Sequence, residues 1–190
     1  AKITVYKTVI NDLEYRHNKS HFMVPKNNNA NLEEVKNNEI ELEEELKQIR
    51  RDFHQNPELG CEENRTSQKI RAYLEKSGIA VKQLTETGMV GLIEGREAGR
   101  TLMLRADIDA LAIQDEKDVD YRSRHEGVMH ACGHDIHMSV WAGTLRTLVA
   151  MKKYWSGTLI AIAQQAEEMS GGAGLAIERG LFQKLPVPDY

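Results

Sequence analysis

The sequence has few of the features of secreted or membrane-bound proteins. Its two cysteines, Cys61 and Cys132, are too few for a disulfide framework and lie in different surroundings, one beside acids and one between histidines. No uninterrupted apolar run reaches the roughly 18 residues of a membrane span, and the N-terminus lacks the apolar centre of a signal peptide. These absences predict a protein of the reducing cytoplasm that has no membrane partner.

An excess of basic residues is also absent. The chain carries 25 Lys and Arg against 29 Asp and Glu, a formal net charge of −4, and no stripe of Lys and Arg occurs along it. A partner with a phosphate backbone would need such a stripe. We therefore expect no nucleic-acid partner.

The chain divides into an N-terminal extension and one domain. Residues 1–40 carry little pattern, and the sequence predicts no role for them. Residues 41–190 are predicted to form the domain, which begins with a helix that ends near Pro57. Its apolar stripe is formed by Leu42, Leu46, Ile49 and Phe53, and its many acids are expected to be its solvated face.

Alternation of helical and extended patterns predicts an α/β fold. A second helix is expected over residues 63–77, ended by Gly78. Strands are predicted over residues 80–84, 89–94, 101–106 and 158–163, and further helices over residues 137–153 and 174–179.

Histidine and cysteine are concentrated in one short segment. Four of the seven histidines and one of the two cysteines fall within residues 125–137. Cys132 and His134, separated by Gly133 in an expected extended loop, can converge on one metal ion. A buried structural cysteine is the alternative. His130 and His137 are weaker candidates, and Asp135 is expected to orient an imidazole.

Two acidic pairs follow predicted strands. Asp107 and Asp109 come directly after residues 101–106, so that they are either site residues or two solvated acids of a turn. Glu167 and Glu168 follow the apolar strand at the edge of the core, where adjacent carboxylates repel unless a cation compensates them. One of them can then bind metal while the other takes a proton from water. An exposed acidic turn before a helix is the alternative.

Taken together, three ordered motifs resemble the metallo-aminoacylase family of amidohydrolases, which includes hippurate hydrolases and auxin-conjugate hydrolases. The motifs are residues 104–111, residues 127–135, and residues 164–168 with the small residues 171–173. The resemblance extends from about residue 45 to about residue 182. It implies a metallopeptidase-like catalytic domain in which helices flank a mixed central sheet.

The resemblance also implies roles for individual residues. Cys132, His134 and Glu168 would be metal ligands, and Glu167 would be the general base. Asp107 and Asp109 would support the site. One or two divalent ions, zinc or manganese, would assist hydrolysis of a small N-acyl amino acid or a peptide-like substrate.

The sequence departs from the family in three respects. Ala112 and Gln165 stand where the family usually has proline, and neither change removes a ligand. The family also has further histidine ligands and a smaller dimerisation domain, whereas no histidine follows His137 here. The resemblance therefore implies the N-terminal part of a catalytic domain, with little activity of its own and an open sheet edge through which it self-associates.

Two other functions remain open at this stage. The chain could be a catalytically incompetent remnant that serves as a metal-binding or interaction module. It could also be a cysteine hydrolase in which Cys132 is the nucleophile and His134 its base. The second alternative leaves Glu167 and Glu168 without a role.

Overall fold

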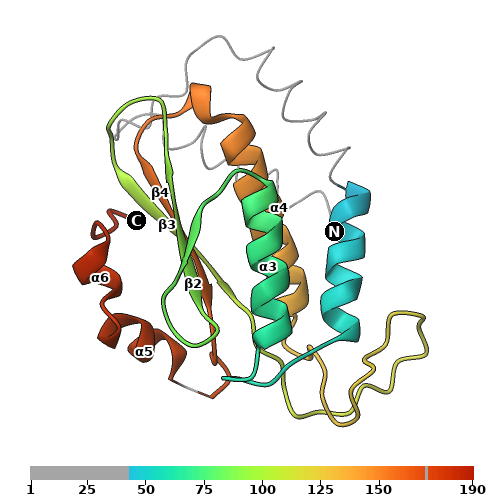
Figure 1. Cartoon of the computed structure of the whole chain (residues 1–190). Helices are drawn as coiled ribbons and strands as arrows, with labels where there is room; N and C mark the ends of the chain where they lie inside the picture. Colours follow the sequence, from blue (N-terminus) through green and yellow to red (C-terminus); the bar gives the residue numbers. More distant parts are fainter. Residues whose placement is uncertain (1–42, 170) are drawn as a thin grey trace.

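The computed structural model describes residues 43–169 and 171–190. The predicted extension, residues 1–40, and the first residues of the predicted domain lie outside this part. Within it, the chain forms a four-stranded sheet with helices on both faces (Figure 1). None of the described helices is long and apolar enough to cross a membrane.

The sheet is mixed, as the family resemblance implied. Its strands are β1 (Val81–Gln83), β2 (Met89–Glu94), β3 (Thr101–Asp107) and β4 (Thr158–Gln164), in the spatial order β1-β2-β4-β3. β1 pairs with β2, and β2 with β4, in antiparallel fashion, whereas β3 and β4 are parallel. The parallel pair requires a long crossover, which contains helix α4 (His134–Ala150).

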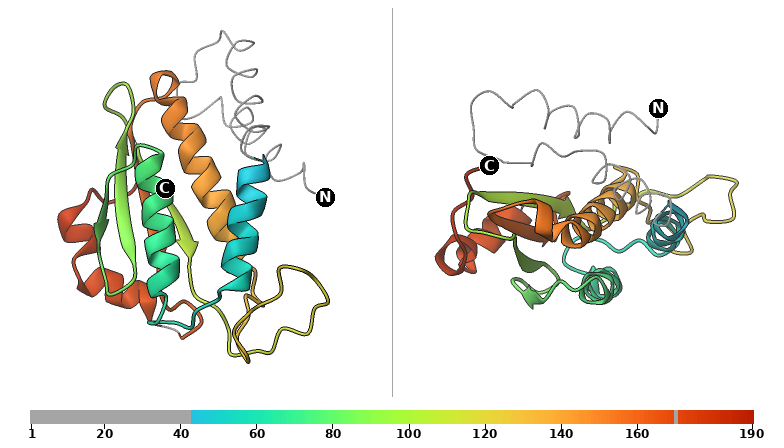
Figure 2. Two further views of the ribbon diagram at one scale, coloured as in Figure 1. Left: turned by 45° about the vertical axis from the view of Figure 1, so that its right-hand side comes forward. Right: turned by 90° about the horizontal axis from the view of Figure 1, so that it is seen from above.

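Helices cover the sheet unequally. One face is covered by α3 (Asn64–Lys76) and α4 (His134–Ala150), with the helix of residues 43–55 beside them (Figures 1 and 2). A short 3-10 turn, η1 (Lys152–Tyr154), leads from α4 towards β4. The short helices α5 (Gly172–Glu178) and α6 (Leu181–Lys184) lie on the other face.

The central strand β4 is buried on both faces. Leu159, Ala161 and Ala163 belong to the main core with residues of α3 and α4. Ile162 contacts the second core cluster, which includes Ala176 of α5. Because helices cover both sides, the strand is a continuous apolar run rather than an alternating one.

Most elements agree with the sequence prediction. Residues 89–94 form a strand with the predicted bounds, and Gly78 has the left-handed φ of 81° expected after α3. The predicted start of α4 was wrong: the helix begins at His134, not at residue 137. Gly133, with φ 90°, turns the chain directly into the helix, so His134 lies in the first turn rather than in an extended loop. Helix α6 was not predicted.

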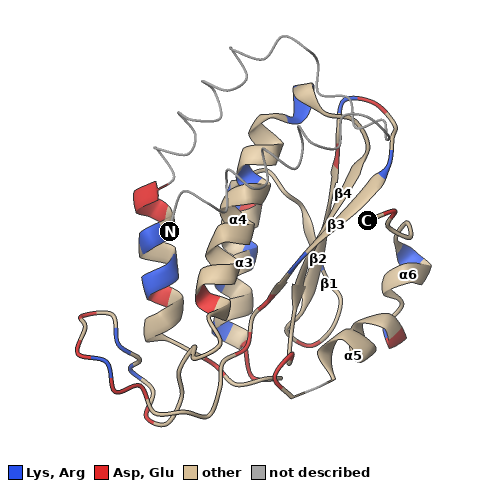
Figure 3. Ribbon diagram, turned by 180° about the vertical axis from the view of Figure 1, so that it is seen from behind, with Lys and Arg blue, Asp and Glu red and all other residues tan. Residues whose placement is uncertain are grey.

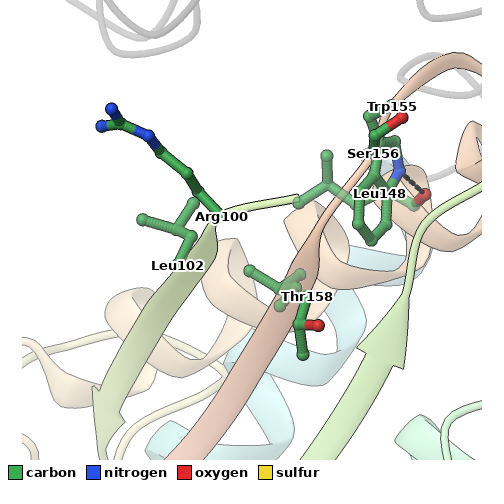
Figure 4. A pocket seen from close by; sticks show the side chains of 7 residues that line it. Arg100, Leu102, Leu148, Trp155, Ser156 and Thr158 are labelled. Carbon is green, nitrogen blue, oxygen red and sulfur yellow. Dashed lines mark hydrogen bonds between the residues drawn. The ribbon is translucent and has the colours of Figure 1, made fainter. Parts of the chain in front are cut away.

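A small apolar cavity lies at the opposite end of the sheet from the acidic pairs. Its volume is about 30 Å³, enough for one or two water molecules. Figure 4 shows the indole N–H of Trp155 donating a hydrogen bond of 2.8 Å to the Leu148 carbonyl beside it. The cavity is lined by Arg100, Leu102, Leu148, Trp155, Ser156, Thr158 and Leu159. It is too small for an organic substrate.

The packing of α4 generates the first prediction. Leu145 on α4 is 0% exposed in the main core, and its replacement by alanine is expected to lower the free energy of unfolding by about 2–5 kcal/mol. Ile177→Ala on α5, where the side chain is 53% exposed, should change it by less than about 1 kcal/mol. Urea unfolding followed by circular dichroism measures both, and equal effects would contradict the assigned core.

Candidate metal centre

The acidic pairs and the start of α4 meet at one edge of the sheet. β3 and β4 run in parallel and end in register at Asp107 and Gln164. The segments that carry Asp109 and Glu168 therefore leave the sheet side by side, and acidic residues gather at this end (Figure 3). In α/β proteins such a C-terminal strand edge is where functional side chains collect.

Three side chains from two segments offer ligand atoms to a common point. One atom each of Cys132, His134 and Glu168 lies within 4.8 Å of the other two. A thiolate, an imidazole and a carboxylate form a ligand set that suits zinc, and modest side-chain rotation would bring them to bonding distance. These are the three residues that the sequence analysis proposed as ligands.

His134 is held by the residue that follows the end of β3. Its Nδ1 lies 3.0 Å from the Asp109 backbone oxygen and 3.2 Å from an Asp109 carboxylate oxygen. Nε2 is left facing Glu167 and Glu168, at 3.8 and 3.9 Å. A histidine ligand whose second nitrogen is held by a carboxylate is the usual arrangement in metal sites, because the contact fixes the ring orientation.

The same contact changes the proton affinity of both partners. The hydrogen bond to Asp109 raises the pKa of His134 to about 9, against the opposing effect of burial. Burial works to raise the pKa of Asp109, but the contact with His134 and the Glu168 N–H, which donates to Asp109 at 2.8 Å, outweigh it and lower that pKa. The buried carboxylate of Asp109 thus orients one candidate ligand, His134, and holds the backbone of another, Glu168.

Cys132 lies at the exposed side of the group. A hydrogen bond with Glu168, followed by desolvation and the charges of Glu168 and Glu167, raises the pKa of its thiol. Without a cation the thiol is therefore protonated at neutral pH. A thiolate at this position requires a positive charge between Cys132 and Glu168.

Unpaired buried oxygens support the fit of a cation. Within the described residues, Asp107 Oδ1 and Glu168 Oε1 are buried and have no hydrogen-bond partner. Buried acceptors without partners are costly, and a bound cation would compensate them. The observed donor set and its electrostatics therefore fit a divalent metal.

Glu167 and Glu168 are adjacent but differ in environment. The side chain of Glu168 is 20% exposed and approaches Cys132 and His134, whereas that of Glu167 is 39% exposed. Glu167 lies outside the three-ligand group and 3.8 Å from His134. It is free to face a substrate or a water molecule.

The weaker candidates of the sequence analysis lie around this group but not in it. Asp107 is buried, and its Oδ2 lies 3.1 Å from Arg105 Nη2 and 3.9 Å from His137 Nδ1. The interpretation of Asp107 and Asp109 as solvated turn acids was wrong, since they are only 4% and 0% exposed. His130 is 4% exposed, its ring nitrogens have no partner among the described residues, and burial lowers its pKa to about 4.

Sequence reasoning missed the network behind the metal group. Asp135 accepts a hydrogen bond of 2.7 Å from His54 and contacts Arg50 at 2.8 Å, so the imidazole that it orients is that of His54. The other nitrogen of His54 faces Asp115 at 3.3 Å. The sequence around His54 and Arg50 does not reveal these contacts, because their partners lie 60 or more residues away in the sequence.

Comparison with known proteins shows which proteins the chain is similar to. Residues 103–190 match the profile of Peptidase family M20/M25/M40. The chain is 43% identical over 155 residues to thermostable carboxypeptidase 2 of Saccharolobus solfataricus, a match that covers 80% of this chain and 39% of that protein. It is 41% identical to N-acetylcysteine deacetylase of Bacillus subtilis (70% and 36% covered) and 41% identical to the IAA-amino acid hydrolase ILR1-like 4 of Arabidopsis thaliana (72% and 31%).

Solved structures give the same result. The YXEP protein of Bacillus subtilis, described as a dinuclear metal binding peptidase from the M20 family, superposes with a TM-score of 0.73 at 38% identity. The match covers 76% of this chain and 41% of that one. The chain spans about two fifths of the length of the relatives that it matches.

The mixed sheet thus carries at its edge a candidate metal site formed by Cys132, His134 and Glu168. The match of residues 103–190 to Peptidase family M20/M25/M40, together with the matches to thermostable carboxypeptidase 2 and the YXEP protein, confirms the family resemblance seen in the sequence.

The pKa values of the ligands generate a prediction about proton release. A metal needs neutral His134 and the Cys132 thiolate, whereas both side chains are protonated at pH 7.5. Zinc binding should therefore release about two protons at pH 7.5, and zinc affinity should rise with pH through the pKa of His134 at about 9. Calorimetric titration in buffers of different ionisation enthalpy counts these protons.

A variant isolates the contribution of His134 to the proton release on zinc binding. Asp109→Asn removes the carboxylate that raises the pKa of His134, so release at pH 7.5 should fall by about one proton. Asp118→Asn, at an exposed position, is the control and should leave the count unchanged. Wild-type protein that releases no proton on binding zinc would contradict the assigned ligands.

Proposed function

We propose that this chain forms part of the catalytic domain of a metal-dependent amidohydrolase that cleaves the amide bond of an N-acyl amino acid or a related small conjugate. Cys132, His134 and Glu168 hold a divalent ion, and Glu167 is the general base. The observation that carries the proposal is the convergence of three ligand atoms within 4.8 Å, with the Glu167 carboxylate beside them but outside the group.

The bound ion would supply Lewis acidity towards the amide carbonyl and would lower the pKa of water. Glu167 accepts the proton of the attacking water and passes it to the leaving nitrogen of the amide. Asp109 keeps His134 in its ligand orientation throughout. We assign Glu168 as a ligand rather than as the base because its carboxylate, unlike that of Glu167, belongs to the three-residue group with Cys132 and His134.

The names of relatives support the substrate class. They include a carboxypeptidase, a deacetylase of N-acetylcysteine and a hydrolase of IAA-amino acid. The proposed substrate is a compound of the kind that these names describe, in which an amino acid forms an amide bond. Nucleic acid and membrane are not part of the proposal.

For the metal, we propose zinc or manganese, in one or two ions. The Cys132 sulfur favours zinc, while the carboxylates also suit manganese. The dinuclear YXEP relative supports a second ion, but within the described residues only the Cys132 group offers three converging ligands. We therefore propose that this chain by itself retains one ion.

The cysteine hydrolase alternative is disfavoured by electrostatics. A nucleophilic cysteine needs a lowered thiol pKa, whereas Glu168 and Glu167 raise that of Cys132. The imidazole of His134 is also held at Nδ1 by Asp109. Both observations favour a shared cation over proton transfer between the two side chains.

We further propose that the chain self-associates through β3, with a second copy as its partner. β3 is an edge strand, and residues 189–190 pair with Thr101 and Met103 at its beginning. Among the described residues, no backbone partner pairs with the outer side of Arg105. Such an edge recruits another strand. The proposed location is the cytoplasm, where the free thiols of Cys61 and Cys132 stay reduced.

The main test distinguishes the roles of Glu167 and Glu168 by mutation. In a preparation that hydrolyses an N-acyl amino acid, Glu167→Gln should lower kcat by about 10²–10⁴-fold, because the base is lost, while zinc affinity changes little. Glu168→Gln should instead weaken zinc binding, because a ligand is lost. Kinetics with parallel metal analysis measures both. Loss of zinc in Glu167→Gln with turnover preserved per bound ion would reverse the two roles.

The remaining alternative, an inactive metal-binding module, is tested on the 190-residue chain. We expect about one zinc ion per chain, turnover of N-acyl amino acids far below the roughly 10 per second typical of enzymes, and concentration-dependent self-association. Metal analysis, an activity assay and analytical ultracentrifugation measure these three quantities. A monomer with turnover at the typical rate would contradict the expectation.

A further inference from the structure

The loop that delivers Glu167 and Glu168 has an unfavourable backbone conformation. Ala166, between β4 and the two glutamates, has a φ of 49°, in the left-handed region that residues other than glycine rarely adopt. Alanine has no polar side chain that could stabilise this conformation from within. The surrounding structure must therefore hold the loop in place.

Glu63, just before α3, supplies the contact that does so. One oxygen of its carboxylate accepts a hydrogen bond of 2.8 Å from the backbone N–H of Ala166. The other oxygen accepts one of 2.6 Å from the Thr87 hydroxyl. Glu63 is 0% exposed, and both of these partners are neutral donors. A carboxylate is costly to bury among neutral groups, which indicates a specific structural requirement at this position.

The residues on either side of Ala166 are held in the same manner. Gln165 is 1% exposed, and its side-chain oxygen accepts hydrogen bonds from the backbone N–H groups of Thr87 and Gly88, at 3.0 and 3.2 Å. Further along, the N–H of Glu168 donates to Asp109. Buried acceptors therefore hold the loop at three successive points. Glu63 acts at the one with the strained backbone.

We propose that Glu63 is a positioning residue of the metal centre. It stabilises the left-handed conformation of Ala166 and thereby aims Glu168, two residues later, at Cys132 and His134. Because this inference concerns the placement of a ligand, it rests on the metal centre proposed above. Glu63 itself does not approach the ion, since the three ligand atoms belong to other residues.

The test shortens Glu63 without removing its charge. Glu63→Asp withdraws the carboxylate by one bond, about 1.5 Å, so that it cannot reach both Ala166 and Thr87. The variant keeps a carboxylate at the residue before α3, and the first-turn backbone N–H groups of Arg65 and Thr66 stay bonded to Glu58, so the start of the helix is preserved. Zinc affinity, measured by chelator competition on the full 190-residue chain, should fall about 10–100-fold.

Two further variants separate positioning from charge and from helix stability. Glu63→Gln can keep one oxygen on the Ala166 N–H and turn its amide towards the Thr87 hydroxyl, so its zinc affinity should stay within about threefold of wild type. Glu58→Asp is the matched control. Glu58 also accepts two backbone N–H bonds at the start of α3, from Arg65 and Thr66 at 3.0 and 2.7 Å, but neither of these contacts involves the 165–168 loop. Its zinc affinity should also be retained.

The readouts are zinc affinity, the visible spectrum of bound Co²⁺, which reports ligand geometry, and the melting temperature of each metal-free variant. A loss of affinity and an altered Co²⁺ spectrum in Glu63→Asp alone would support the proposal. Wild-type affinity in Glu63→Asp, or an equal loss in Glu58→Asp, would overturn it. If wild-type protein itself binds no zinc, the proposed metal centre fails instead, so the two failures are distinguishable.

Discussion

The parallel pairing of β3 with β4 is the contact on which the rest of the structure depends. Its register, from Thr101 opposite Thr158 to Asp107 opposite Gln164, makes the two strands end together. Only then can Asp109, which follows one strand, bind both His134 and the backbone of Glu168. The crossover between the strands contains α4, whose first residue is His134. The β3–α4–β4 connection therefore supplies both the parallel strand pair and a candidate metal ligand.

Carboxylates at this edge have two kinds of task. Glu63 and Asp109 are fully buried and accept hydrogen bonds from backbone N–H groups, which stabilises the loop conformation. The side chains of Glu167 and Glu168 are more exposed, and they face His134 at 3.8 and 3.9 Å. The inner pair is already satisfied mainly by the protein, whereas the outer pair gains from a cation. The distinction explains how so many acids can occupy one small region.

The sequence predicted the parts of this arrangement that depend on local pattern. The continuous apolar strand of residues 158–163 and the ligand chemistry concentrated around Cys132 and His134 are visible without coordinates. The start of α4 was missed because a left-handed glycine can precede a helix as well as follow one. The roles of Glu63 and His54 depend on partners about 60 to 100 residues away, which no local period reveals.

Formation of the ligand group is also coupled to the order of folding. Cys132 and His134 are two residues apart and can meet an ion in a partly folded chain, whereas Glu168 joins them only after β4 has docked beside β3. An ion held by all three therefore binds the native state more tightly than any open state, and it shifts the equilibrium towards the docked strand. The yield of folded chain during synthesis would then depend on metal availability, because the proposed ion would stabilise the state in which β4 has docked beside β3.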